Sequence, residues 1–143
     1  MSSFKAASIP KYSVICLPIK FGESEHRLSK QFVVLCHQGG YAVCLKATSK
    51  VEIYINNKEQ MGGCVFYKRG ETTIFKQDTA IQPDNQIPIS HLEIETNHTR
   101  NSLDILGVLP VAFERQLIQA IRNSVTLSDR ERKRLFLVLN IIP

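Results

Sequence analysis

Residues 31–48, QFVVLCHQGGYAVCLKAT, are the part of the sequence that indicates the fold most clearly. Two apolar runs rich in β-branched residues flank Gly39 and Gly40. Glycine supplies the positive φ angles that a tight hairpin turn needs. We therefore predict that residues 31–37 and 41–48 form the two strands of an antiparallel hairpin.

Short runs of the same character surround this hairpin. They are residues 12–19, 51–55, 63–68 and 72–76, and we predict a strand at each. A polar segment, residues 21–30, is predicted as a long loop between the first strand and the hairpin. Short strands at such close spacing are typical of a small antiparallel barrel.

The pattern changes to a helical period near the C-terminus. Apolar residues recur at Phe113, Leu117, Ile118 and Ile121, which predicts a helix over residues 111–123. Ser128 stands three residues before Glu131, the spacing of a capping box, so a second helix is predicted over about 128–140. Residues 77–110 carry Pro83 and Pro88 and are predicted to be irregular, with one strand at residues 92–95.

The 143 residues are enough for a single domain, residues 1–143. Within it we predict a barrel over about 12–95 and a helical extension over about 110–140. The net charge is +5, and the first 50 residues carry seven basic and two acidic side chains. A site for a polyanion is therefore expected in the first third. No apolar run reaches the roughly 18 residues of a bilayer-spanning helix, so we expect a soluble cytoplasmic protein without membrane contact.

The four cysteines, Cys16, Cys36, Cys44 and Cys64, lie inside apolar runs without a C-x-x-C pair. That spacing favours buried free thiols over a zinc site. The sequence also lacks a Gly-rich phosphate loop, a G-x-S-x-G motif and an H-E-x-x-H motif. We therefore expect neither a cofactor nor a metal. What remains is a set of polar residues at predicted strand ends, which a barrel would bring together.

The segments LPIKF, FVVLC and YAVCLKATSK, in this order, resemble the opening of PemK/MazF-type toxins. The resemblance covers about residues 12–92. Proteins of that family are small SH3-like barrels that cleave RNA, and they are the toxins of type II toxin–antitoxin modules. In the family an Arg-Pro pair opens the second strand, where this chain has Lys30 and Gln31, and a Thr-Ser pair ends the third, which matches Thr48 and Ser49.

The resemblance implies catalysis by attack of a ribose 2′-hydroxyl on the adjacent phosphorus, without a metal. Lys30 or Arg27 would stabilise charge or act as the acid, Thr48 would position the phosphate, and Asp78 or His26 would be the base. The residues expected to contact the nucleic acid are Lys20, Lys46, Ser49, Lys50 and Lys76. Lysine provides only a point charge where the family's arginine would grip phosphate with a planar fork.

The residues leave three functions open. The first is an RNA-cleaving toxin, with RNA and an antitoxin carrying an acidic tail as its partners. The second is a non-catalytic barrel that binds nucleic acid or a protein. The third is a structural assembly protein, which would explain the helices but not the basic first third. The apolar C-terminal run LFLVLNIIP also favours a homodimer.

Overall fold

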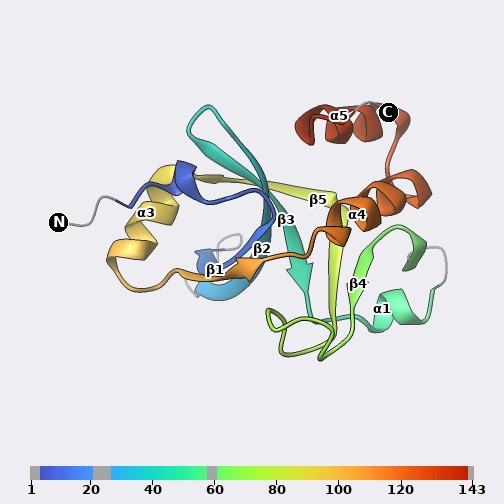
Figure 1. Cartoon of the computed structure of the whole chain (residues 1–143), viewed down its shortest axis with the longest axis horizontal. Coiled ribbons are helices and arrows are strands. Elements are labelled where there is room, and N and C mark those ends of the chain that lie inside the picture. The colour runs from blue at the N-terminus through green and yellow to red at the C-terminus, as the bar shows by residue number, and fades with distance from the viewer. Residues whose placement is uncertain (1–3, 21–26, 58–60, 142–143) are drawn as a thin grey trace.

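The computed structural model describes residues 4–20, 27–57 and 61–141 of the chain. This part of the molecule is mainly β: one antiparallel sheet curls into a half-barrel, with helices against both of its faces (Figure 1). The strands lie in the spatial order β4-β5-β3-β2-β1-β6. Their bounds are Ser13–Lys20 for β1, Arg27–Gln38 for β2, Tyr41–Thr48 for β3, Val65–Tyr67 for β4, Thr79–Ser90 for β5 and Asp104–Val108 for β6.

Helical elements lie before, between and after the strands. The described ones are the 3-10 helix η1 (Ala6–Ser8) and the α-helices α1 (Glu52–Ile55), α3 (His91–Thr99), α4 (Ala112–Asn123) and α5 (Asp129–Val138). In Figure 1, η1 and α3 lie on one side of the strands and α4 and α5 lie on the other. None of the helices in the described ranges is long and apolar enough to cross a membrane.

The predicted central hairpin is confirmed. β2 and β3 pair antiparallel, and the turn between them uses Gly39 and Gly40 with φ angles of 55° and 82°. The strands predicted at residues 12–19 and 63–68 are also present, as β1 and the shorter β4. The φ angles of Gly39 and Gly40 lie in the left-handed region that glycine adopts without steric cost.

The predicted loop over residues 21–30 is shorter than expected. β2 begins at Arg27, and its first residues pair with β1 as far as Lys20 opposite Arg27. Residues 27–30 are therefore strand, and the rest of that predicted loop lies outside the described residues. The β1–β2 ladder thus extends well past the end of β3 at Thr48.

The central strands are buried on both faces of the sheet. In β2, Val33 and Leu35 belong to the core under α4 and α5, whereas Phe32 and Val34 belong to the core under α3 and η1. Strands covered on both faces have continuous apolar sequences. This explains why the run FVVLC does not alternate with polar residues.

The strand predicted at residues 51–55 is wrong, because this segment forms helix α1. Val51 and Tyr54 are buried together with Cys64 and Ala80 in a small cluster beside the sheet. The spacing of Val51 and Tyr54 fits one turn of helix, and their burial outweighs the β propensity of the run VEIYI.

The strand predicted at residues 72–76 is also wrong. Thr72 Oγ1 accepts hydrogen bonds from the backbone N–H groups of Ile74 and Phe75, at 3.2 Å and 3.4 Å. Such local bonds compete with a strand ladder. The segment is therefore a loop, and it places the buried Phe75 in the larger core.

Residues 77–110 are not irregular, since they hold β5, α3 and β6. β5 accommodates both of its prolines. Pro83 lies in a bulge, residues 82–85, between the paired residues Ile81 and Gln86. Pro88 lies beyond the end of the β4–β5 ladder, where the described strands give β5 a neighbour on one side only. Edge positions and bulges are where strands accept proline.

The run LEIE, predicted as a strand at residues 92–95, forms the first part of α3. Ser90 caps this helix, because its Oγ accepts a hydrogen bond from the Glu93 N–H at 3.0 Å. Ile94 is fully buried, while Leu92 is 75% exposed. The alternation of the run was therefore coincidental, and the serine cap decides its conformation.

Both predicted C-terminal helices are confirmed, as α4 and α5. The capping box of α5 is complete: Ser128 Oγ accepts from the Glu131 N–H, and the Glu131 carboxylate accepts from the Ser128 N–H. Phe113 and Leu117 of α4 and Leu135 of α5 are fully buried in the larger core. The two helices therefore cover the sheet.

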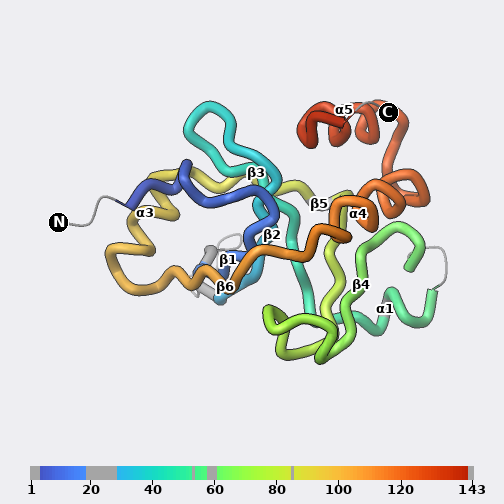
Figure 2. The backbone as a smooth tube through the Cα atoms, in the orientation of Figure 1, coloured from blue at the N-terminus to red at the C-terminus, as the bar shows by residue number. Residues whose placement is uncertain are grey.

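The sheet is curled into a half-barrel, and β4 and β6 are its two edges among the described strands. β6 joins the sheet beside β1, past the predicted end of the barrel near residue 95, and Figure 2 shows these two strands together. The loop between β4 and β5 reaches β6, where a Cβ on Gly107 would be 3.2 Å from Ile74 Cγ1. The side chain of Ile74 thus lies close to the backbone of β6.

Candidate nucleic-acid interface

A cleft of about 390 Å³ opens where the loop between β4 and β5 passes over the sheet. It is lined from β1, β2, β3, β5, β6 and two connecting segments. The lining residues with polar or charged side chains are Cys16, Ser29, Lys30, Gln31, Lys46, Thr48, Ser49, Lys50, Lys76, Gln77, Thr79 and Asp104. We call this the lysine cleft.

Strand register builds the floor of the lysine cleft. Cys16 of β1 is paired with Gln31 of β2 on one side and with Asp104 of β6 on the other, and Gln31 is paired with Ala47 of β3. Residues directly opposite one another on neighbouring strands share one face of the sheet. A row from Asp104 to Ala47 therefore crosses four strands at the same level.

Positive charge dominates the lysine cleft. Among the described residues, its lining contains Lys30, Lys46, Lys50 and Lys76, against one carboxylate, that of Asp104. Charges of one sign around a hollow in a low-dielectric wall concentrate the electrostatic field in it. The cleft is therefore suited to a ligand that carries several negative charges.

Thr48 ends β3 beside these lysines. Its Oγ1 accepts a hydrogen bond from the Lys50 N–H at 3.1 Å, which closes the turn after the strand. A hydroxyl that accepts one bond keeps its own proton for donation. Thr48 is thus both a turn cap and a donor that a phosphate oxygen in the cleft can use.

Cys16 lines the lysine cleft as a neutral thiol. Burial raises the pKa of its thiol, and the carboxylate of Asp104 raises it further. A thiol nucleophile needs the opposite shift. All four cysteines are free, as predicted; Cys44 and Cys64 are buried, whereas Cys16 and Cys36 are only half-buried.

Asp78 does not line the lysine cleft, although its neighbours Gln77 and Thr79 do. Its Oδ1 accepts a hydrogen bond from the Arg69 N–H at 2.7 Å, which holds the carboxylate on the loop between β4 and β5. Asp78 is therefore not placed as the base that the sequence suggested. Six other predicted residues line the cleft together: Lys30, Lys46, Thr48, Ser49, Lys50 and Lys76.

The remaining predicted residues belong to the far end of the β1–β2 ladder. Lys20 is the last residue of β1 and is paired in register with Arg27, the first residue of β2. Along the ladder, this pair is three pairs from Lys30, which is paired with Leu17, and four pairs from Cys16, which is paired with Gln31. His26 lies outside the described residues.

Asp104 lines the cleft but was not predicted from the sequence. It enters the cleft because β6 pairs with β1, and the sequence predicted no strand at residues 104–108. The run DILGV begins with Asp104 and contains Gly107, and both residue types are depleted in strands. The neighbouring apolar residues at 105, 106 and 108 were the available signal.

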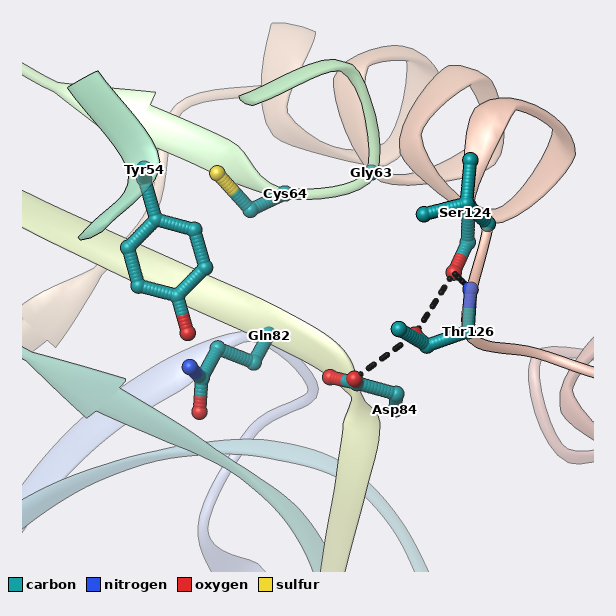
Figure 3. A pocket seen from close by; sticks show the side chains of 8 residues that line it. Tyr54, Gly63, Cys64, Gln82, Asp84, Ser124 and Thr126 are labelled. Atoms are coloured by element: carbon teal, nitrogen blue, oxygen red, sulfur yellow. Dashed lines mark hydrogen bonds between the residues drawn. The ribbon is translucent and has the colours of Figure 1, made fainter. Parts of the chain in front are cut away.

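A second, much smaller pocket lies between α1, the β5 bulge and the segment that joins α4 to α5 (Figure 3). Its volume is about 30 Å³, enough for about one water molecule. Thr126 Oγ1 donates to Asp84 Oδ2 at 2.8 Å and lies 3.1 Å from Ser124 Oγ. This chain of hydrogen bonds ties the helix connection to the sheet.

No family model matches the sequence, and no curated protein matches it closely enough to count as a relative. Function is therefore inferred from the lysine cleft and its lining residues.

Proposed function

We propose that this chain binds RNA in the lysine cleft and cleaves it without a metal ion, as the toxin of a toxin–antitoxin pair with a PemK/MazF-like, SH3-like fold. The observation that carries the proposal is the gathering of Lys30, Lys46, Lys50 and Lys76 with Thr48 around one cleft. RNA is the expected polyanion because its 2′-hydroxyl can supply the nucleophile.

In the proposed reaction, the ribose 2′-oxygen attacks the adjacent phosphorus as a base removes its proton. The new bond joins this oxygen to phosphorus, and the bond from phosphorus to the 5′-oxygen of the next nucleotide breaks. Asp104 replaces Asp78 as the candidate base, and Lys30 protonates the leaving 5′-oxygen. Thr48, Lys46 and Lys50 hold the phosphate and its developing charge. The products are a 2′,3′-cyclic phosphate and a 5′-hydroxyl.

The proposed partners follow from the same electrostatics. An acidic antitoxin segment lying in the lysine cleft would compete directly with RNA. A second copy of the chain would pair along β6, the edge strand on which Ile105 and Val108 are 48% and 54% exposed. In the cell, we expect expression without the antitoxin to arrest growth.

A second candidate function is RNA binding without cleavage. It is favoured by the position of Asp78, which is held away from the cleft and leaves Asp104 as its one carboxylate among the described lining residues. Both candidates predict salt-sensitive binding, so cleavage separates them.

The test is incubation of the purified chain with end-labelled RNA in EDTA, with Lys30→Ala, Thr48→Ala and Asp104→Asn variants. A true catalytic group contributes roughly 10² to 10⁴ in rate, so cleavage should fall by that factor. Lys133→Ala, at an exposed position on α5, is the matched control and should cleave normally. Intact RNA with retained binding would support the non-catalytic candidate, and absence of binding would contradict both.

Binding itself has a quantitative signature. For single strands, the logarithm of the binding constant falls with the logarithm of salt concentration by about 0.7 for each phosphate contact. We expect alanine at Lys30, Lys46, Lys50 or Lys76 to reduce this slope by about that amount each. The slope of Lys133→Ala should equal that of the unmodified chain.

A further inference from the structure

Apart from the small pocket in Figure 3, a hollow of about 380 Å³ adjoins the lysine cleft, and we call it the second hollow. It is lined by Lys46, Thr48, Lys50, Glu52, Tyr54 and Gln82, and the first three of these also line the cleft. Lys46, Thr48 and Lys50 therefore stand between two hollows. Both volumes lie within the range of about 300–1,000 Å³ that small-molecule sites occupy.

The β5 bulge creates this second hollow. Ala47 is paired with Ile81 and Leu45 with Gln86, so residues 82–85 of β5 face a single residue of β3, Lys46. A bulge redirects side chains and interrupts the ladder. Gln82, the first residue of the bulge, lines the hollow opposite the end of β3.

Strand alternation directs the binding side chains toward the second hollow. Ala47 packs in the core under α4 and α5. Its neighbours Lys46 and Thr48 therefore belong to the opposite face of β3. Ala47 lines only the lysine cleft, whereas Lys46 and Thr48 line both hollows. A phosphate held by these two residues thus has one hollow on either side.

The other lining groups suit the edge of a nucleobase. Glu52 is exposed on α1 and provides two acceptor oxygens, while the amide of Gln82 both donates and accepts. Tyr54 is almost fully buried, and its ring forms part of the wall. Burial raises the pKa of the Tyr54 hydroxyl, with a further contribution from Asp84, so it stays neutral. Figure 3 shows Tyr54 and Gln82 from the side of the small pocket.

We propose that the second hollow is a nucleobase subsite that prefers guanine, next to a phosphate held by Lys46, Thr48 and Lys50. This inference deepens the proposed function and rests on it. Guanine offers two adjacent donors, N1–H and the N2 amino group, to the carboxylate of Glu52. Adenine and cytosine offer an amino group beside an acceptor, and uracil offers one N–H between two carbonyl groups. Single-stranded RNA is commonly recognised through such base edges.

The test measures binding of short single-stranded oligonucleotides by fluorescence anisotropy. The oligonucleotides are uridine-rich and 2′-O-methylated, so that they cannot be cleaved, and one position carries guanine, inosine, adenine or uracil. Inosine lacks only the N2 amino group of guanine. We expect guanine to bind roughly tenfold more tightly than inosine, and more tightly still than adenine or uracil.

The variants separate base recognition from phosphate binding. Glu52→Gln should remove most of the preference for guanine over inosine, whereas Lys46→Ala should weaken binding to every oligonucleotide by a similar factor. Asp129→Asn, which neutralises an exposed carboxylate on α5, is the matched control and should keep the preference.

The outcomes distinguish this inference from the proposed function. Binding of every sequence with equal affinity, or an unchanged guanine preference in Glu52→Gln, would overturn the guanine subsite and leave RNA binding intact. If none of the oligonucleotides binds, and ordinary RNA of mixed sequence does not bind either, the proposed function fails along with the subsite.

Discussion

Ser13 in β1 and Ser124 after α4 are both buried, but only one of their hydroxyl groups is satisfied. Among the described residues, Ser13 Oγ is the buried side-chain atom without a hydrogen-bond partner. Ser124 Oγ accepts from the N–H groups of Leu127 and Thr126, at 3.2 Å and 3.3 Å. Leaving a buried hydroxyl without a partner costs about 1–3 kcal/mol.

We therefore expect opposite effects from the same substitution at these two serines. Ser13→Ala should raise the free energy of unfolding by about 1 kcal/mol or leave it unchanged, and Ser124→Ala should lower it by roughly 1 kcal/mol. Urea denaturation of the two variants and the unmodified chain measures both. An equal loss in the two variants would contradict the assignment of Ser13.

Glu114 predicts how stability depends on pH in the acid range. Its carboxylate accepts hydrogen bonds from the Tyr12 hydroxyl at 2.6 Å and from Lys11 Nζ at 3.3 Å. The bond from Tyr12 is the largest cause that lowers the pKa of Glu114 below its ordinary value of 4.5; burial opposes it, and the bond and charge of Lys11 lower the pKa further. The ionised form is thus favoured in the folded state.

A lowered pKa stabilises the fold above the ordinary value, and this contribution is lost as pH falls through the folded pKa. We expect Glu114→Gln to be less stable than the unmodified chain at pH 7, by less than about 1 kcal/mol because the group is half exposed. The difference should shrink below pH 4.5. Urea denaturation at several pH values checks this, and a difference independent of pH would refute it.

Among the elements, the loop between β4 and β5 approaches β6 where Ile74 lies close to Gly107. Gly107 has a φ of 145°, and a Cβ at this position would meet Ile74 Cγ1 at 3.2 Å. We expect Gly107→Ala to cost about 1–3 kcal/mol through backbone strain and this contact. Gly70, with a φ of 91° and open space around it, is the control for strain alone.

Urea denaturation separates the strain from the contact. The variants are Gly107→Ala, Gly70→Ala, Ile74→Ala and the double variant of Gly107→Ala with Ile74→Ala. The contact should make Gly107→Ala the more costly of the two glycine substitutions. The double variant should lose less stability than the sum of the losses in Gly107→Ala and Ile74→Ala. Equal costs at the two glycines and additive effects at Ile74 would mean that the loop does not hold β6.

At the scale of the whole molecule, α5 belongs to the core that stabilises the sheet. Phe136 is 5% exposed and its neighbour Leu137 is 79% exposed. Phe136→Ala should lower the free energy of unfolding by about 3–5 kcal/mol, and Leu137→Ala should change it by less than about 0.5 kcal/mol. If α5 were only an added contact surface, the two variants would have similar stabilities in urea.

The elements predicted correctly have signals that act within a few residues. Gly39 and Gly40 define the hairpin turn, and Ser128 with Glu131 defines the start of α5. Each of these signals is a backbone conformation or a cap that needs no distant partner. The segment at residues 51–55 failed because its conformation depends on burial against Cys64 and Ala80.

For the candidate site, the charged residues could be predicted from the sequence: Lys30, Lys46, Lys50 and Lys76 were all predicted site residues, and they line one cleft. The position of Asp104 in the cleft, and of Asp78 outside its lining, became known only from the folded sheet. The two cases differ in how far apart along the chain the interacting residues are. Turns, caps and charge are properties of neighbouring residues, whereas the pairing of Asp104 with Cys16 joins residues far apart in the chain and depends on how the whole sheet packs.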